Sequence, residues 1–384
     1  MPIKEPQLIE GSNAVFEIAG VLKAKNINNV LLVTDNALFK LKLMQPLMEA
    51  LESANIKVHV YKDVTANPTV DNVEAALAIY KAYTCQGIIA FGGGSPIDCA
   101  KIVGARVVRP KKSVQAMRGL LKIRKKTPFF IAVPTTAGTG SEATLAAVIS
   151  NPSTQDKFPI NDHVLVPDVA VLDVELILNL PPFLTATTGM DVLTHAVEAY
   201  IGKSNTKKTL RWSEEAIKLV FAYLLRSYQN PQDKEARQNM LKASYYAGAA
   251  FTRAYVGYVH AIAHTFGGFY QVPHGYANAV VLPHVLTHYG KHVVKPLSKL
   301  ALQNDLCNAS MTSEVCAQRF IEAIQQLNKA MNIPTTIDKI QSKDIPNMVE
   351  KAMSEGNPLY PVPKIWKQKD FERIYYKLQE KNTI

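Results

Sequence analysis

The sequence predicts an α/β domain built on a parallel sheet, followed by a domain made of helices. Short apolar runs alternate with amphipathic stretches through the first half, as in βαβ units. Beyond residue 180 these runs give way to long helical patterns. A chain of 384 residues, 47% of them hydrophobic, is also long enough for two cores. We therefore expect two domains, residues 1–180 and 181–384.

The expected strands are short β-branched or apolar runs, each followed by a turn. They are residues 30–34, 58–61, 87–91, 129–134 and 169–173. Residues 38–54 and 70–83 lie between them and carry apolar side chains at three- and four-residue spacing, which is typical of helices that cover a sheet.

A Leu-Pro-Pro sequence at residues 180–182 marks the change from alternating strand and helix patterns to long helical patterns. The helices expected after it are residues 189–201, 210–228, 234–252, 257–267 and 313–331. Few strand patterns remain in this half, so we expect an all-α second domain.

The formal net charge of +11 raises the question of an acidic partner. The most basic stretch, residues 109–126, contains no acid, but it also contains no aromatic side chain that could stack on bases. No nucleic-acid-binding motif accompanies it. We expect a solvated surface excursion and no nucleic-acid partner.

Two further features bear on location. No apolar run approaches the roughly 20 residues of a membrane span, and the start MPIKEPQLIEG has no apolar core of the kind a signal peptide needs. The cysteines Cys85, Cys99, Cys307 and Cys316 show neither CxxC spacing nor the density of a disulfide scaffold. We expect free thiols, a cytoplasmic protein and no membrane partner.

A glycine-rich turn follows the expected strand at residues 87–91. It reads Gly92-Gly93-Gly94-Ser95-Pro96, and residues 97–107 then have helical character. Glycines let the backbone approach a bulky anion, and the start of a helix favours phosphate. The turn matches neither GxGxxG nor the P-loop, and a turn without a ligand is the alternative.

A second turn, TTAGTGSE at residues 135–142, follows the strand at 129–134 and is rich in hydroxyls. A capped turn is its alternative reading. Two such turns at neighbouring parallel strands indicate one dinucleotide across the carboxyl edge of the sheet. Asp35, directly after VLLVT, is placed to accept the ribose hydroxyls of NAD and to repel a 2′-phosphate, although a helix-capping Asp is equally compatible.

Histidines and one carboxylate recur at helical spacing in the second half. His260 and His264 are four residues apart, as are Asp191 and His195, and His274 follows a Gly-Gly pair and a proline. Hydrogen-bonded pairs are the alternative, but the surroundings are uncharged and Ala- and Gly-rich, where an unpartnered charge is costly. A divalent-metal site explains both pairs. Spacing alone leaves open which of the three histidines 260, 264 and 274 bind the metal.

Five motifs together resemble the iron-containing (group III) alcohol dehydrogenases, in the superfamily that also holds glycerol dehydrogenase and dehydroquinate synthase. The resemblance covers nearly the whole chain. The motifs are GGGSPIDCAK at 92–101, PTTAGTGSE at 134–142, PDVAVLD at 167–173, TGMDVLTHAVEAY at 188–200 and HAIAHTFGGFYQVPHGYANA at 260–279. DVEL at 173–176 departs from the more usual DPEL.

The resemblance implies a dehydroquinate synthase-like fold, with a Rossmann-like first domain and a homodimer whose active site lies between the domains. It implies that Fe²⁺, or sometimes Zn²⁺, is bound by Asp191, His195, His260 and His274. His264 matches a histidine near the nicotinamide that is not a ligand, and we expect it to be the catalytic proton relay. The implied NAD contacts are Asp35, Gly93, Gly94, Ser95, Asp98, Thr135, Thr136 and Lys157.

The implied activity is hydride transfer between NAD and a small to medium primary alcohol or its aldehyde, with the metal activating the alcohol oxygen. Phe251 and Ala146 match pocket positions of the family. A metal-dependent lyase like dehydroquinate synthase is the alternative, but it would need a basic cluster for its anionic substrate. A basic nucleic-acid-binding protein is the remaining alternative.

Overall fold

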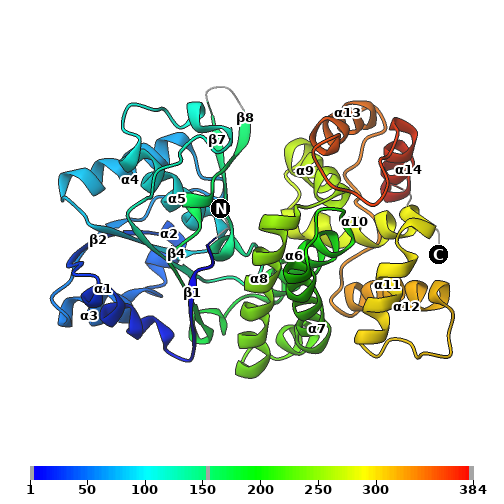
Figure 1. The fold of residues 1–384 in the computed structure, drawn as a ribbon, viewed down its shortest axis with the longest axis horizontal. Coiled ribbons are helices and arrows are strands. Elements are labelled where there is room, and N and C mark those ends of the chain that lie inside the picture. The colour runs from blue at the N-terminus through cyan, green and yellow to red at the C-terminus, as the bar shows by residue number, and fades with distance from the viewer. Residues whose placement is uncertain (1–3, 153–155, 380–384) are drawn as a thin grey trace. The chain divides into compact units, whose positions relative to one another are not determined.

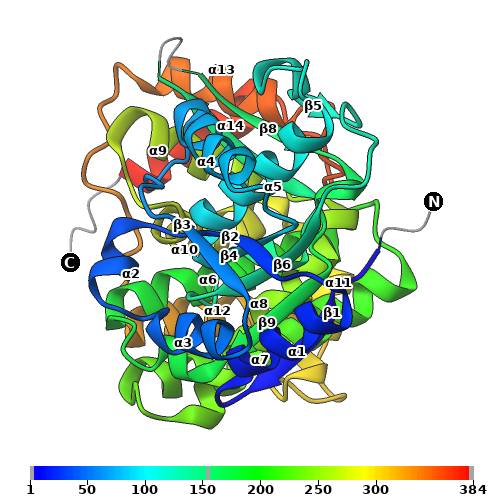
Figure 2. The same ribbon diagram turned by 90° about the vertical axis from the view of Figure 1, so that its left-hand side faces the viewer.

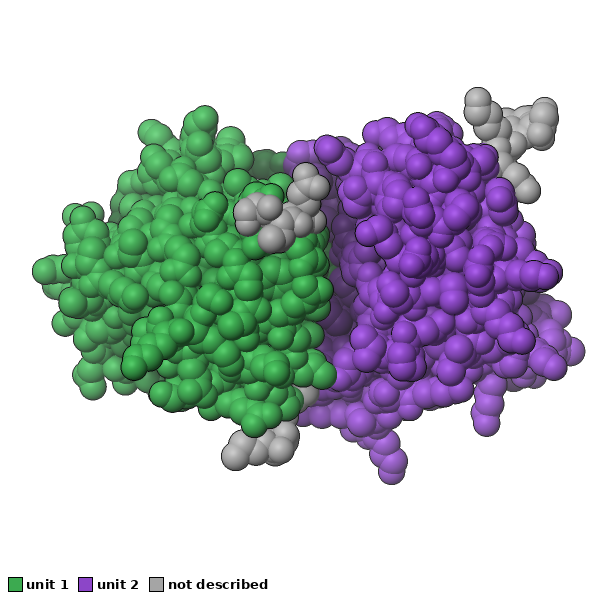
Figure 3. Space-filling view, turned by 90° about the horizontal axis from the view of Figure 1, so that it is seen from above, with its two compact units in different colours: residues 1–179 green, residues 180–384 purple. Residues whose placement is uncertain are grey.

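The computed structural model describes residues 4–152 and 156–379. The chain forms two compact units, residues 1–179 and residues 180–384 (Figure 3).

The first unit, which carries the N-terminus (Figure 1), contains a six-stranded, fully parallel sheet in the order β1-β9-β6-β4-β2-β3 (Figure 2). This topology confirms the α/β prediction, and the five predicted strands are present with ends within one residue of those expected. The first strand was not predicted, because QLIEG is a partly exposed edge strand with few apolar residues. The strands are β1 (Gln7–Gly11), β2 (Asn29–Val33), β3 (Lys57–Tyr61), β4 (Gly87–Gly92), β6 (Phe129–Pro134) and β9 (Val169–Asp173).

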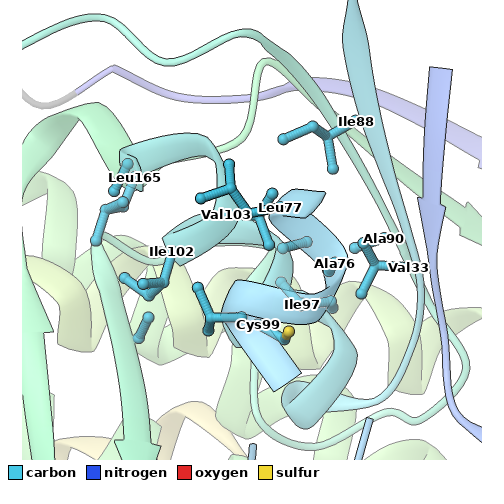
Figure 4. Packing of buried hydrophobic residues seen from close by; sticks show 14 of the residues in the cluster. Val33, Ala76, Leu77, Ile88, Ala90, Ile97, Cys99, Ile102, Val103 and Leu165 are labelled. Atoms are coloured by element: carbon cyan, nitrogen blue, oxygen red, sulfur yellow. The ribbon is translucent and has the colours of Figure 1, made fainter. Parts of the chain in front are cut away.

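Helices cover both faces of this sheet. Helices α4 (Val70–Ala82) and α5 (Gly94–Val108) pack on one face, and α1 (Glu17–Ala24) and α3 (Gln45–Ser53) pack on the other (Figure 2). Strand β4 contributes to both cores, because Ile88 and Ala90 point to the first face (Figure 4) while Ile89 and Phe91 point to the second. Burial on both faces explains why the central strands are continuous apolar runs.

The single helix expected at residues 38–54 is wrong. The chain forms a short helix, α2 (Asn36–Lys40), and then α3. Lys42 between them adopts φ 54°, in the left-handed region, and Pro46 lies in the first turn of α3, where its fixed φ suits a new start.

A second sheet of three strands was not predicted. It contains β5 (Gly119–Leu120), β8 (Asp156–Asn161) and β7 (Ala146–Asn151), in that order. The basic stretch at 109–126 contributes β5 and is more firmly attached than expected, since Val114, Met117 and Ile123 are buried. Asp162 accepts hydrogen bonds from the backbone N–H groups of Ile123 and Arg124. Most other side chains of this stretch are exposed, among them Lys111, Arg118, Lys122 and Arg124, so the stretch is the expected surface excursion, anchored by a few buried residues.

The described part of the second unit contains helices and no strand, which confirms the all-α prediction. Within residues 4–152 and 156–379, no helix is both long enough and apolar enough to cross a bilayer. The helices are α6 (Pro182–Ile201), α7 (Lys207–Gln229), α8 (Lys234–Ala254), α9 (Tyr258–Tyr270), α10 (His274–Tyr289), α11 (Val294–Gln303), α12 (Ser313–Ala330), α13 (Ile345–Gly356) and α14 (Gln368–Gln379).

The expectation of four free thiols is wrong for one pair. Cys307 and Cys316 form a disulfide, whereas Cys85 and Cys99 are buried free thiols. Between the two cysteines the chain turns back at residues 308–311, where the N–H of Met311 donates to the carbonyl of Asn308, and then enters α12. The two cysteine Cα atoms lie 5.5 Å apart, a separation that a disulfide can span. Sequence spacing does not show such a reversal. The bond removes one reason for expecting a cytoplasmic location.

Candidate active site

Four side chains of the second unit bring their ligand-type atoms within 4.8 Å of one another: Asp191, His195, His260 and His274. Asp191 and His195 lie one turn apart on α6, His260 lies in the first turn of α9, and His274 begins α10. The first three are buried and His274 is partly exposed. The structure thus brings together the four residues that the sequence suggested as ligands.

Close helix packing makes this convergence possible. A Cβ atom at Gly275 would lie 2.3 Å from the backbone oxygen of Thr187, so only glycine allows the first turn of α10 to lie this close to α6. As a result, Nε2 of His274 lies 3.5 Å from Oδ1 of Asp191.

The chemistry of the donor set fits a divalent cation. Burial lowers the pKa of His195 to about 4 and the pKa of His260 well below its usual value, so both rings are neutral and keep a lone pair for a metal. Nδ1 of His195 is buried and has no hydrogen-bond partner among the described residues. A bound cation would satisfy this atom, and three imidazoles with one carboxylate suit Fe²⁺ or Zn²⁺.

Glu198, which the sequence reading missed, holds one of these histidines. Its Oε2 lies 2.6 Å from Nδ1 of His260 and accepts the N–H of Gly257, and its Oε1 accepts the N–H of Val259. Burial raises the pKa of Glu198 to about 8, against the lowering effect of these three hydrogen bonds. The carboxyl group of Glu198 therefore satisfies backbone N–H groups at the N-terminus of α9. Because it also contacts Nδ1 of His260, Nε2 of that ring is left to face the cluster. Its position three residues after His195, on one helical face, could have revealed it.

Asn278 on α10 was also missed, although it lies four residues after His274. Its amide nitrogen donates to Oδ1 of Asp191 at 2.7 Å and lies 3.2 Å and 3.1 Å from Nε2 of His260 and His274. The amide thus points a partial positive charge at three of the four ligand-type atoms, as a cation would.

His264 lies beside this group. Its ring stacks on His274 with centroids 5.1 Å apart, and its side chain is partly exposed. Nδ1 of His264 is 2.7 Å from Oε1 of Glu355 on α13, and Tyr360 donates its hydroxyl to the same oxygen. Burial acts to raise the pKa of Glu355, but the hydrogen bonds from His264 and Tyr360 and the nearby histidine charges together outweigh it, and the pKa is lowered.

An aromatic ring closes another side of the cluster. Phe251 on α8 stacks on the imidazole of His195, with ring centroids 4.2 Å apart and an angle of 15° between the planes. An apolar wall therefore lies directly against one of the ligand-type histidines.

In the first unit, the two glycine turns lie against each other at the ends of β4 and β6. Gly92 adopts φ 152°, and Cβ atoms at Gly93 and Gly94 would lie 3.4 Å and 3.0 Å from the side chains of Thr136 and Thr139. Among the described residues, no side chain caps the N-terminus of α5, which begins at Gly94. Backbone N–H groups in a space this narrow fit a pyrophosphate.

The other expected cofactor residues lie around these turns. Thr135 is buried, and its N–H donates to the carbonyl of Gly92. Ser95 donates to the carbonyl of Ala66, and Nζ of Lys157 donates to Oδ1 of Asn67, so both side chains contact one loop after β3.

Two expected cofactor contacts have structural partners. Asp98 accepts hydrogen bonds from the hydroxyl of Ser141 and the N–H of Val148, and so joins α5 to the second turn and to β7. Asp35 caps α2, because its Oδ1 accepts the N–H of Leu38 at 2.9 Å. Asp35 is therefore a helix cap, as one of the two sequence interpretations had it. A carboxylate can accept more than one hydrogen bond, so Asp35 can cap α2 and still accept a ribose hydroxyl.

A buried lysine holds the second turn in place. Nζ of Lys101 on α5 donates to the hydroxyls of Ser141 and Thr144 and to the carbonyl of Ala146. Burial lowers the pKa of Lys101 to about 8, although the charges of Asp98 and Glu142 act to raise it.

Comparison with known proteins extends over both units. Residues 6–174 match the family described as iron-containing alcohol dehydrogenase, and residues 185–379 match the C-terminal part of the Fe-containing alcohol dehydrogenase family. Alcohol dehydrogenase 4 of Schizosaccharomyces pombe is 38% identical over 357 residues, which are 91% of this chain and 83% of the relative. An NADPH-dependent butanol dehydrogenase of Clostridium saccharobutylicum is 36% identical, over 85% of this chain and 86% of its own.

A solved structure of 1,3-propanediol oxidoreductase superposes with a TM-score of 0.94 at 33% identity, over 98% of this chain and 100% of its own. Both halves of the chain therefore match one family in sequence and in fold. The protein belongs to the iron-containing alcohol dehydrogenase family.

Proposed function

We propose that this alcohol oxidoreductase transfers hydride between NAD and small to medium primary alcohols or their aldehydes, and that it requires Fe²⁺ or Zn²⁺. Residues 1–180 would bind the dinucleotide, and residues 181–384 would carry the metal and the catalytic groups. The observation that carries the proposal is the convergence of Asp191, His195, His260 and His274 within 4.8 Å.

The four side chains would hold the cation, while Glu198 and Asn278 keep His260 and Asp191 in orientation. A cation in such a site supplies Lewis acidity, which lowers the pKa of an alcohol hydroxyl and polarises an aldehyde carbonyl. Phe251 would limit the room beside His195, which favours an unbranched carbon chain at the reacting end.

His264 would take the hydroxyl proton and pass it to solvent. Its ring stacks on His274, and its side chain is 43% exposed, so it can contact both substrate and water. We propose this relay as its catalytic role.

The backbone N–H groups at the start of α5 would bind the pyrophosphate, with Gly93 and Gly94 leaving space for it. Thr135, Thr136, Ser95, Asp98 and Lys157 lie around the same turns. Asp35 would accept the ribose hydroxyls and so select NAD, unlike the relative named as NADPH-dependent. A homodimer and a cytoplasmic location belong to the same proposal, and sedimentation and cell fractionation test them.

The test combines metal content with turnover. Protein loaded anaerobically with Fe²⁺, or with Zn²⁺, is assayed by the absorbance of NADH against primary alcohols of increasing chain length. His274→Ala should lose metal and activity together, because it removes one of four ligands. His264→Ala should keep the metal and lose turnover. Full turnover without metal, or no turnover with any alcohol, would overturn the proposal.

A further inference from the structure

We propose that Glu355 and Tyr360 form a positioning pair that keeps the proton of His264 on Nδ1, so that Nε2 is the nitrogen that accepts the substrate proton. The inference rests on the proposed function, because it assigns the atom through which His264 acts.

Three polar groups form a chain that ends at the imidazole. Oε1 of Glu355 lies 2.7 Å from Nδ1 of His264 and accepts the hydroxyl of Tyr360, also at 2.7 Å. A carboxylate only accepts hydrogen bonds, and Tyr360 already donates to this oxygen. The remaining partner, Nδ1, must therefore be a donor, and Nε2 is the one ring nitrogen that can present a lone pair.

The helix that carries Glu355 is held against α9. Gly356 packs so closely on Tyr258 of α9 that a Cβ atom would lie 2.8 Å from its ring. The hydroxyl of Tyr258 donates to Oδ1 of Asn357, directly after α13. On α14, Tyr375 hydrogen-bonds to Thr265 of α9 and donates to the carbonyl of Met348 of α13. These contacts fix the distance between Glu355 and His264 independently of the bond between them.

Stacking and hydrogen bonding together leave the imidazole one orientation. The ring of His264 lies nearly parallel to that of His274, with 18° between the planes, and edge-on to His260 at 6.0 Å. Stacking sets the plane of the ring, and the contact with Glu355 decides which nitrogen points away from α13. A histidine that relays protons needs a fixed ring plane and a fixed tautomer, because the accepting nitrogen must be unprotonated and must point at the proton donor.

The position of Glu355 also argues against a contact made only for helix stability. It is the second-to-last residue of α13, where the partial negative charge of the helix end disfavours a carboxylate. The favourable partners of Glu355 are His264 and Tyr360, which lie outside its own helix.

The experiment uses the zinc-loaded holoenzyme, because Zn²⁺ is diamagnetic, with ¹⁵N-labelled histidine. Long-range ¹H–¹⁵N spectra report which ring nitrogen of His264 carries the proton. In wild type we expect the Nδ1–H form. In Glu355→Ala we expect a mixture of both tautomers, a fall in kcat of about tenfold, unchanged metal content, and KM values for alcohol and NAD within about twofold. Glu350→Ala, an exposed position on the same helix, is the control.

A double-mutant cycle separates positioning from simple packing. If Glu355 acts through His264, adding Glu355→Ala to His264→Ala should not lower kcat further, whereas independent effects would multiply. Tyr360→Phe, which keeps the ring and removes the donor, should give a smaller change in the same direction. Where Glu355→Ala unfolds, Glu355→Gln serves, since its amide can also donate and so removes the bias between the tautomers.

An unchanged tautomer in Glu355→Ala or Glu355→Gln, or multiplicative losses in the cycle, would overturn the inference. The spectra do not depend on turnover. A wild-type enzyme without alcohol oxidation would overturn the proposed function, while the tautomer of His264 would still decide whether the pair positions it.

Discussion

Glu198 illustrates at the scale of one residue how a side chain that need not touch the metal can determine how well it is held. Glu198→Gln keeps the volume but replaces one acceptor oxygen by an NH₂ group, which would face the N–H donors of Gly257, Val259 or His260. We expect metal affinity to fall about ten- to a hundredfold. Competition against a chelator measures it. Glu215→Gln, exposed on α7, should leave the affinity unchanged, and equal affinities in both variants would refute the assigned role.

Asp35 sets the expected choice of cofactor. Because Asp35 is partly exposed, repulsion of a 2′-phosphate is worth only about 1 kcal/mol, the lower end of the range for charges at about 4 Å, or about fivefold in kcat/KM. Asp35→Gly should shift the NAD to NADP ratio by this factor. Glycine is an acceptable N-cap, so the fold should tolerate the loss of the contact with Leu38.

The control for this change is Asp71→Asn, an exposed acidic position on α4. The ratio of kcat/KM values for the two cofactors is the measurement. If Asp35→Gly and Asp71→Asn leave the ratio equally unchanged, Asp35 is only a helix cap.

At the scale of elements, Lys101 ties α5 to the second glycine turn and predicts a pH dependence of stability. Burial lowers its folded pKa to about 8 from 10.5, so between these values the unfolded chain binds more protons than the folded one. The contribution of Lys101 to stability is therefore complete above pH 10.5 and is lost as the pH falls to about 8. Across this pH range the contribution of Lys101 to the free energy of unfolding changes by about 3 kcal/mol.

Lys101→Met should remove this dependence. Free energies of unfolding from urea titrations at pH 8 and pH 10.5 should rise more in wild type than in the variant, by up to about 3 kcal/mol. The comparison cancels Tyr80 and Cys85, whose raised pKa values change stability in the opposite direction over part of this range. Parallel pH profiles would show that Lys101 is protonated as readily in the folded protein as in the unfolded chain.

At the scale of the whole molecule, the metal should stabilise the second unit and leave the sheet of the first unchanged. The four ligand-type residues lie on α6, α9 and α10, and none lies in residues 1–179. At a metal concentration a hundred times Kd, binding contributes about 2.7 kcal/mol, or about a hundredfold slower exchange of amides that open only with that unit.

Hydrogen exchange followed by mass spectrometry tests this expectation. A chelator should speed exchange in α6, α9 and α10 and leave β4 and β6 as they were. In His274→Ala the chelator should have little effect, because the site is already weakened. Faster exchange spread evenly over both units would show that the two unfold together.

The sequence by itself determined five strands of the main sheet, five helices of the second unit and the chemical nature of the sites. Short β-branched or apolar runs predicted five strands of the main sheet, and helical spacing placed Asp191 with His195 and His260 with His264. These patterns work because strand and helix periodicity, turn chemistry and capping act between residues a few positions apart. The two-helix break at Lys42 and the edge strand at Gln7–Gly11 escaped them, since each depends on one unusual φ angle or on a neighbouring strand.

Only the tertiary structure decided which atoms meet. Spacing left three histidines open as ligands, and helix packing set His264 beside the cluster and gave its Nδ1 to Glu355, 91 residues away. Glu198 reaches His260 across 62 residues, and Asn278 reaches Asp191 across 87. Contacts over such separations depend on how closely helices approach, which glycines at 275 and 356 permit and local sequence patterns do not report. The side chains of His264, Glu198 and Asn278 are visible in the sequence, but the partners that give them their roles become neighbours only when the helices pack.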